Sequence, residues 1–179
     1  MTDTPVIPGD RVRLRPLQQS DAAALHAIYS DAGAMTWWSH GPLATLEETE
    51  AKLARNLDAP DWRAWAMTLA EDDVAIGTLS AHHKRQGGVA EIGYSLVPAY
   101  WGRGLAREAV GLLIDYLFDV EGYRRICADT DPDNAASNAL LTRLGFEIEG
   151  RLRAEWETHL GVRDSFIWGL LPDDRRRAA

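Results

Sequence analysis

Residues 96–109 read LVPAYWGRGLAREA, and this stretch decides the fold because it joins a strand to a helix through a glycine turn. The apolar run from Val89 to Val97 has the composition of a buried strand and ends at Pro98. After the turn, apolar residues recur at helical spacing as far as Val120. We therefore expect a strand, a tight turn and a long amphipathic helix in succession.

The turn has the residue types of a binding site for a diphosphate group. Its two glycines lack a Cβ and let the backbone approach a ligand closely. The free N–H groups at the helix start converge on one spot, where the helix dipole favours negative charge. Two arginines can add charge-assisted hydrogen bonds to phosphate oxygens. An ordinary strand–turn–helix connection with surface arginines is the alternative. The candidate residues are Gly102, Arg103, Gly104, Leu105, Ala106 and Arg107.

The spacing of these residues distinguishes three kinds of phosphate ligand. A P-loop requires Gly-Lys-Ser/Thr, which does not occur in this sequence. A dinucleotide-binding turn requires a third glycine where Arg107 stands. Coenzyme A (CoA) suits the order better, with its diphosphate on the helix start and its pantetheine arm along the strand. Because Pro98 cannot donate a ladder hydrogen bond, we expect the strand end to splay and the arm to pair with the backbone of Leu96 and Val97.

A second helix, downstream, has a polar start of its own. Residues 134–146 read NAASNALLTRLGF, in which Asn134 is a suitable N-cap and Gly145 a suitable residue after the last turn. Asn134 and Ser137 are three residues apart and share a helix face, so both can contact one ligand. Helix capping alone is the alternative role for each of them.

Together the two segments resemble the GCN5-related N-acetyltransferase (GNAT) superfamily. The stretch WGRGLA at residues 101–106 resembles the diphosphate-binding motif of that family, and residues 134–146 resemble its second CoA-contacting motif. The lead-in EIGY at residues 91–94 and Ser137 are similar to one branch, the ribosomal-protein-alanine N-acetyltransferases of the RimJ/RimL type. The resemblance implies acetyl-CoA as co-substrate, and it extends from about Val89 to Glu155.

The hydrophobic patterning along the chain predicts the order β-α-α-β-β-β-α-β-α-β-β, which matches the acetyltransferase fold. This is an α/β (α+β) arrangement with a mixed sheet of about seven strands, helices on both faces and a single domain over residues 1–179. A hairpin is expected across Gln86-Gly87-Gly88, and a capping box at Thr45 and Glu48. The expected strands are 11–17, 62–70, 74–83, 89–97, 125–130, 146–157 and 164–171, with helices from 20, 45, 105 and 134.

The resemblance implies direct transfer of the acetyl group from acetyl-CoA to an amine, which must first lose a proton. Glu155 and Glu91 are the candidate bases, acting directly or through a water. The resemblance favours Glu155, but Glu157 would share its strand face, so the choice between them stays open. For Glu91, an ion pair or an exposed strand position is the alternative.

The leaving thiolate must gain a proton. Many relatives place a tyrosine seven residues after the asparagine equivalent to Asn134, but this chain has Leu141 there. The resemblance to the ribosomal-protein branch instead implies that Ser137 hydrogen-bonds or protonates the sulfur. A thiol has a pKa of about 8.5 and leaves fairly easily, so weak assistance is enough.

Trp37 and Trp38 lie between the first two expected helices, where acceptor specificity usually resides in this family. They are candidates for an acceptor wall or a homodimer contact, with core packing as the alternative. The expected acceptor is the α-amine of a protein N-terminus. A small amine (an antibiotic, a polyamine or an amino acid) is an alternative acceptor, and a non-catalytic CoA-binding regulator is an alternative function.

The overall composition limits the kinds of partner that we expect this protein to bind. A formal net charge of −8 argues against nucleic acid, and apolar runs are too short to span a membrane. With no signal peptide evident, a cytoplasmic location is expected. One cysteine, Cys127, and scattered histidines make a metal site improbable. His82 and His83 point to opposite faces of a strand, which favours surface or partner-facing roles. Residues 175–177, a run of three arginines, are expected to form a solvated tail.

Overall fold

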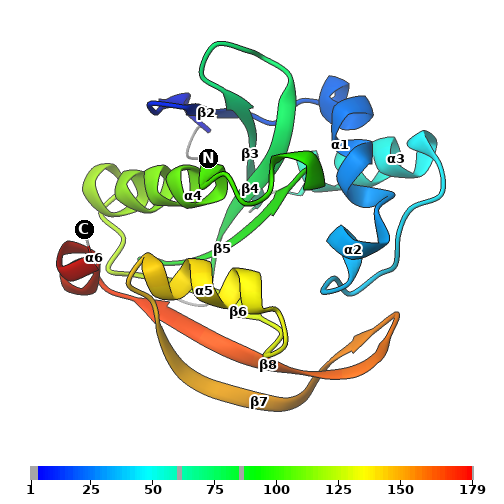
Figure 1. The fold of residues 1–179 in the computed structure, drawn as a ribbon. Helices are drawn as coiled ribbons and strands as arrows, with labels where there is room; N and C mark the ends of the chain where they lie inside the picture. Colours follow the sequence, from blue (N-terminus) through cyan, green and yellow to red (C-terminus); the bar gives the residue numbers. More distant parts are fainter. Residues whose placement is uncertain (1–3, 60–61, 85–86, 179) are drawn as a thin grey trace.

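The computed structural model describes residues 4–59, 62–84 and 87–178, which form an eight-stranded mixed sheet flanked by helices (Figure 1). The strand order is β1-β2-β3-β4-β5-β6-β8-β7, and β5 and β6 form the parallel pair of this otherwise antiparallel sheet. The strands are β1 (Ile7–Pro8), β2 (Val12–Pro16), β3 (Trp62–Leu69), β4 (Ala75–His83), β5 (Val89–Leu96), β6 (Arg125–Thr130), β7 (Glu147–Thr158) and β8 (Gly161–Leu170).

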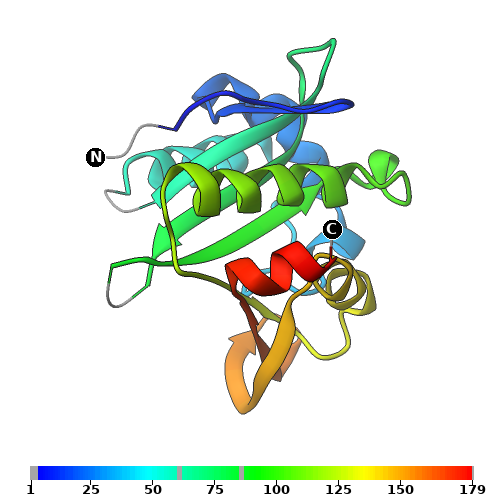
Figure 2. The ribbon, with the colours of Figure 1, turned by 90° about the vertical axis from the view of Figure 1, so that its left-hand side faces the viewer.

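Helices cover both faces of the sheet, as expected. The buried side chains of α1 and α3 belong to one core cluster, and those of α4 and α5 belong to a larger one on the opposite face. Figure 2 shows α4 crossing in front of the sheet, with α1 and α3 behind it. The helices are α1 (Ala22–Tyr29), α2 (Ala32–Met35), α3 (Leu46–Leu57), α4 (Leu105–Asp115), α5 (Ala135–Arg143) and α6 (Pro172–Ala178), with short 3-10 turns at Gln19–Asp21 and Pro98–Tyr100.

Local sequence signals set the helix ends. The Thr45 side chain accepts a hydrogen bond from the backbone N–H of Glu48, whose own side chain accepts from the N–H of Thr45, so the capping box is confirmed. The N-cap of α4 is Gly104, which has a φ of 75°, and α5 is followed by Gly145, which has a φ of 93°. Because left-handed backbone of this kind strains a residue with a Cβ, these two positions favour glycine.

The structure adds elements that the patterning did not predict. There are eight strands rather than about seven, and β1, α2 and α6 are additional. The arginine run at 175–177 lies in α6 rather than in a solvated tail, and Arg175 Nε binds Asp115 Oδ1 at 2.8 Å. The predicted long helix ends at Asp115 and continues to Val120 as a π-helical turn. Strands β4 and β5 pair as expected, but Gln86 of the predicted hairpin turn lies outside the described residues.

The sheet opens between its two central strands. Within the described residues, β5 pairs with β6 only where residues 89–91 face residues 125–127. Beyond that point β5 remains paired with β4 as far as Leu96, while β6 remains paired with β8 as far as Thr130. The opening therefore begins well before Pro98. The splay that the sequence predicted is present, but it arises because the two strands follow different neighbours, and not because of the proline.

Candidate active site

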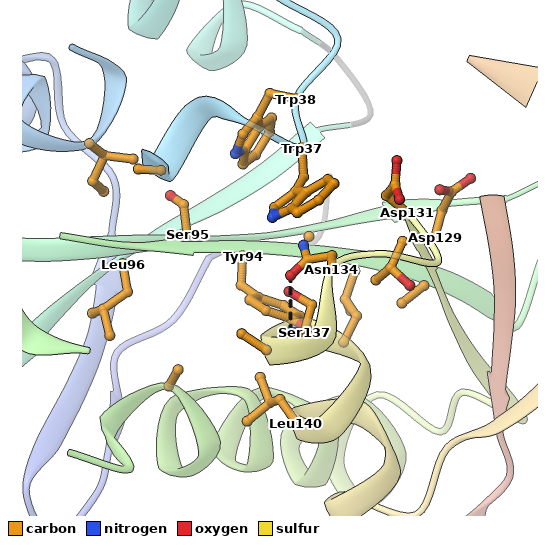
Figure 3. Close-up of a pocket in the computed structure, with 18 of the residues that line it drawn as sticks. Trp37, Trp38, Tyr94, Ser95, Leu96, Asp129, Asp131, Asn134, Ser137 and Leu140 are labelled. Atoms are coloured by element: carbon orange, nitrogen blue, oxygen red, sulfur yellow. Dashed lines mark hydrogen bonds between the residues drawn. The ribbon is translucent and has the colours of Figure 1, made fainter. Parts of the chain in front are cut away.

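A cavity of about 1100 Å³ lies at this opening (Figure 3). Its walls come from the diverging edges of β5 and β6, the starts of α4 and α5, the segment around α2, and the β7–β8 hairpin. Of the residues that the sequence singled out, the lining includes Trp37, Trp38, Glu91, Leu96, Gly102, Gly104, Leu105, Ala106, Arg107, Asn134 and Ser137. The fold therefore brings most of the candidate residues to one place.

The glycine turn forms one end of the cavity. Gly102 and Gly104 have φ values of 73° and 75°. A Cβ on Gly102 would meet no atom of the described chain within 4 Å, so the backbone conformation rather than lack of space favours glycine there. Arg107 lines the cavity. Arg103 is not part of the lining, but its guanidinium lies 5.3 Å from the ring centroid of Tyr100, which is.

The opened edge of β5 presents unpaired backbone to the cavity. Val97 N donates to Ile76 O of the neighbouring strand at 2.8 Å, so this N–H is not available to a ligand. Because hydrogen-bonding directions alternate along an antiparallel strand, the backbone groups of Tyr94 and Leu96 face the opening instead. Leu96 O accepts from Trp101 Nε1 at 2.8 Å. The N–H of Leu96 is thus suited to a pantetheine amide, whereas the side chain of Val97 is buried in the core around α1 and α3.

The start of α5 forms the adjoining wall. The side chain of Asn134 accepts a hydrogen bond from Ser137 N at 3.2 Å, so Asn134 is the N-cap of this helix. The hydroxyl of Ser137 takes no part in the cap, and both residues line the cavity. Leu141 is fully buried in the core and does not reach the cavity. Ser137, in the first turn of α5, therefore presents its hydroxyl to the cavity.

Tyr94 is a residue of this wall that the sequence reading did not single out. Its hydroxyl is buried, has no hydrogen-bond partner among the described residues, and lies beside Ser137 (Figure 3). Burial raises the pKa of Tyr94 to about 12, against a smaller opposing effect of Ser137. The phenol is therefore neutral and able to donate a hydrogen bond at physiological pH. The strand alternation of residues 91–94, which turns Tyr94 toward α5, is the signal that could have found it.

Glu91 lies on the opposite face of β5 with two basic neighbours. It forms an ion pair with Lys84, and its Oε1 is 3.5 Å from His82 Nε2. Burial favours the neutral acid, but hydrogen bonds and charges from His82 and Lys84 outweigh it and lower the pKa of Glu91 to about 2. His82 also lines the cavity and stacks on Trp62, with ring centroids 5.0 Å apart. His82 therefore faces the cavity beside Glu91.

Glu155 is placed on β7, exposed and outside the cavity lining, and Glu157 is exposed there too. A bulge between Leu152 and Trp156, with Ala154 at a φ of 52°, breaks the alternation of this strand. It is Trp156 that reaches the cavity, where its Nε1 donates to Asp129 Oδ2 at 3.2 Å. The bulge therefore decides which side chains of β7 face the cavity, and the spacing of residues in the sequence does not predict it.

Trp37 and Trp38 stand at the far wall (Figure 3). Trp37 is 38% exposed, and the guanidinium of Arg163 lies 5.7 Å from its ring centroid. Arg163 is itself held by Asp131, with Nε and Oδ2 2.7 Å apart. Trp38 is partly buried against the core around α1 and α3. An aromatic wall with paired charges therefore faces the opening of the sheet.

Comparison with known proteins agrees with this geometry. The family described as the acetyltransferase (GNAT) domain matches residues 11–147. The uncharacterized N-acetyltransferase YoaA of Bacillus subtilis (strain 168) is 31% identical over 157 residues, which cover 83% of this chain and 86% of that protein. The crystal structure of a GCN5-related N-acetyltransferase from Brucella melitensis superposes with a TM-score of 0.87 at 28% identity, covering 99% of this chain and 85% of that one.

Two relatives from Escherichia coli (strain K12) have names that state an acceptor. Spermidine N(1)-acetyltransferase is 26% identical and covers 81% of this chain and 77% of its own length. The [ribosomal protein uS5]-alanine N-acetyltransferase is 36% identical over 75 residues, 38% of this chain and 39% of its own length. The match over residues 11–147, the shared fold and the opened sheet lead to one conclusion: the chain belongs to the GNAT family of acetyl-CoA-dependent N-acetyltransferases.

Proposed function

We propose that this protein transfers the acetyl group of acetyl-CoA to a primary amine, and that its acceptor is the α-amine of a protein N-terminus. The observation that carries the proposal is the opening between β5 and β6, which has the glycine turn at one side and the tryptophan wall at the other. A donor and an acceptor that enter from these two sides meet at the opened strand edge.

The residues at the opening fit the donor. The N–H groups at the start of α4 suit a diphosphate, and the free edge of β5 suits the amides of a pantetheine arm. The buried hydroxyl of Tyr94 makes no hydrogen bond among the described residues and is therefore free to pair with the neighbouring Ser137. Acetyl-CoA supplies the acetyl group as an activated thioester. The cofactor-binding set is Leu96, Gly102, Gly104, Leu105, Ala106, Arg107, Asn134 and Ser137, with Arg103 at its rim.

We assign to Ser137 the role of hydrogen-bond donor to the departing sulfur, and to Tyr94 the role of donor to Ser137. The Ser137 hydroxyl is left free by the cap that its backbone forms with Asn134. Tyr94 can donate to Ser137 Oγ because burial keeps the phenol protonated. A serine hydroxyl that accepts one hydrogen bond is polarised as a donor, so Ser137 is suited to donate to the departing sulfur.

On the amine side we favour Glu91 with His82 over Glu155. Glu91 and His82 line the cavity, whereas Glu155 does not. A carboxylate with a pKa of about 2 is a weak base, so its main effects here are to hold His82 and to attract the ammonium form of the acceptor. An imidazole is the side chain best matched to proton transfer near neutral pH.

Because Glu91 is a weak base, this site suits an α-amine better than a more basic acceptor. An α-amine has a pKa of about 7.7–8.0 and is partly neutral at pH 7, whereas an amine with a pKa of about 10.4 needs a stronger base to lose its proton. The second candidate is a polyamine, because the relative named for spermidine matches 81% of this chain. The relative named for a ribosomal protein matches 38%.

The acceptor is tested by mass spectrometry of purified protein with acetyl-CoA and a panel of acceptors. The panel contains peptides with free N-termini, the same peptides with blocked N-termini but free lysines, and spermidine. We expect acetylation of the free α-amine and none of the blocked peptide. Acetylation of spermidine without any peptide product would replace the protein acceptor with a polyamine.

A further inference from the structure

Arg11, directly before β2, contacts the turn that precedes α4. Its Nη1 donates to Arg103 O at 3.0 Å, and its Nη2 donates to Gly104 O at 3.4 Å. Its Nε donates to Glu108 Oε2 at 2.8 Å. One guanidinium therefore binds both carbonyl oxygens of the glycine turn and a carboxylate one helical turn beyond it.

Glu108 completes this contact from the helix side. Its Oε1 accepts from the backbone N–H of Arg11 at 2.7 Å and of Val12 at 3.1 Å. Burial favours the neutral acid, but the hydrogen bonds from Arg11 and Val12 outweigh it and lower the pKa of Glu108. The start of β2 and the first turns of α4 are thus joined at defined atoms.

These carbonyl contacts help to fix which way the N–H groups of the turn point, together with the helical hydrogen bond from Glu108 N to Gly104 O at 3.2 Å. In a planar trans peptide, the C=O of one residue and the N–H of the next point in opposite directions. Arg11 holds the C=O of Arg103 and of Gly104, so the N–H groups of Gly104 and Leu105 are directed away from Arg11. Gly104 and Leu105 line the cavity, and Arg11 does not.

We propose that Arg11 is a positioning residue for the diphosphate of CoA. It acts through the turn, without contact to the ligand, by fixing the N–H donors of Gly104 and Leu105. The inference rests on the proposed binding of acetyl-CoA at this turn. The side chain of Arg11 is 55% exposed, and exposed ion pairs contribute little to folding stability. A loss of CoA affinity is therefore separable from a loss of fold.

The test compares two acetyl donors in the Arg11→Ala variant. Acetyl-CoA carries the diphosphate, whereas S-acetylpantetheine has the same thioester and arm without it. We expect the KM for acetyl-CoA and the Kd for CoA to rise about tenfold with kcat unchanged, the effect of losing hydrogen bonds from a charged group. The kcat/KM for S-acetylpantetheine should not change, and Arg11→Lys should restore part of the affinity because an ammonium can still bind one carbonyl.

Arg13→Ala is the matched control, because Arg13 lies two residues further along the chain, in β2, and pairs with Asp73 outside the cavity lining. This variant should bind CoA like the parent. An Arg11→Ala protein within twofold of the parent for acetyl-CoA would overturn the proposal, and so would an equal loss with S-acetylpantetheine. If the parent protein itself turned over neither donor, the proposed function would fail instead, and direct CoA binding would still test Arg11.

Discussion

Glu91 shows how its neighbours set the charge of a single side chain. Its pKa of about 2 lies below the ordinary value of a glutamate, so its ionised form is favoured by folding. The resulting stability is fully present above the unfolded pKa and is lost as pH falls through the folded one. We expect Glu91 to contribute at most about 3 kcal/mol, lost between about pH 4.5 and pH 2. Denaturant unfolding of the parent and of Glu91→Gln across this range measures it.

The difference in unfolding free energy between those two proteins should be constant from pH 7 to pH 5 and shrink below. A difference that shrinks near pH 6 instead would show that the lowered pKa of Glu91 is not the source of the interaction. Because the lowered pKa keeps Glu91 ionised at pH 4.5, protonation of Glu91 should cause no step in the activity of the parent near this pH. The pH profiles of the parent and of Glu91→Gln should therefore have the same shape there.

Tyr94 and Ser137 are expected to act as a pair. We predict that Tyr94→Phe lowers kcat about tenfold, the value of roughly one hydrogen bond, and leaves the Kd for CoA within twofold. If the two hydroxyls act in series, the double variant with Ser137→Ala should be no slower than Ser137→Ala alone. Tyr123→Phe is the control, because its hydroxyl binds His83 Nδ1 at 3.1 Å outside the cavity lining. Additive losses in the double variant would refute the pairing.

At this scale most of the residues that the sequence singled out line the cavity, and the sequence missed lining residues whose position depends on neighbouring strands. Gly102, Gly104, Asn134 and Ser137 were found because glycine turns and helix caps are local signals. Tyr94 was missed because the burial of its unpartnered hydroxyl depends on what packs around it. The position of Glu155 depends on the bulge at Ala154, which nothing in the local spacing announces.

At the scale of elements, the glycine turn and α4 act as a unit, and two glycines with the same backbone test it. Gly104 has a φ of 75° and lines the cavity, whereas Gly122 has a φ of 69° and lies outside the lining. Valine at either position should cost about 1–2 kcal/mol of backbone strain. We predict similar drops in Tm for Gly104→Val and Gly122→Val, but loss of the CoA-induced thermal shift in Gly104→Val alone. An equal CoA shift in both variants would show that the turn does not bind the diphosphate.

Elements that contain at least two repeats of their own period were predictable, as in β2, α3 and β6. The additional elements β1, α2 and α6 each contain fewer than two repeats, so no period shows in them. The opening of the sheet was expected for the wrong reason. It depends on which neighbour each of two strands keeps, and that is a property of distant pairings, not of Pro98.

At the scale of the whole molecule, the sheet consists of two halves, β1–β5 and β6–β8, that share three paired residues on each strand. The amide groups of Leu96 and Val97, at the end of β5, can show whether a ligand occupies the opening between the two halves. Val97 N–H is bonded to Ile76 O and should exchange slowly with or without CoA, whereas Leu96 N–H faces the opening. We predict that CoA slows exchange at Leu96 and leaves Val97 unchanged, as measured by amide exchange in NMR. Equal protection of both amides before CoA is added would contradict this assignment.

The short parallel contact between residues 89–91 and 125–127 also means that side-chain packing, more than strand pairing, joins the two halves of the sheet. One buried hydrophobic cluster contains residues of β4, β5, β6 and β8 together with residues of α4 and α5. On the proposed function, the pantetheine arm takes the place of a paired strand along the free edge of β5. The bound donor therefore completes the sheet for as long as it is held there.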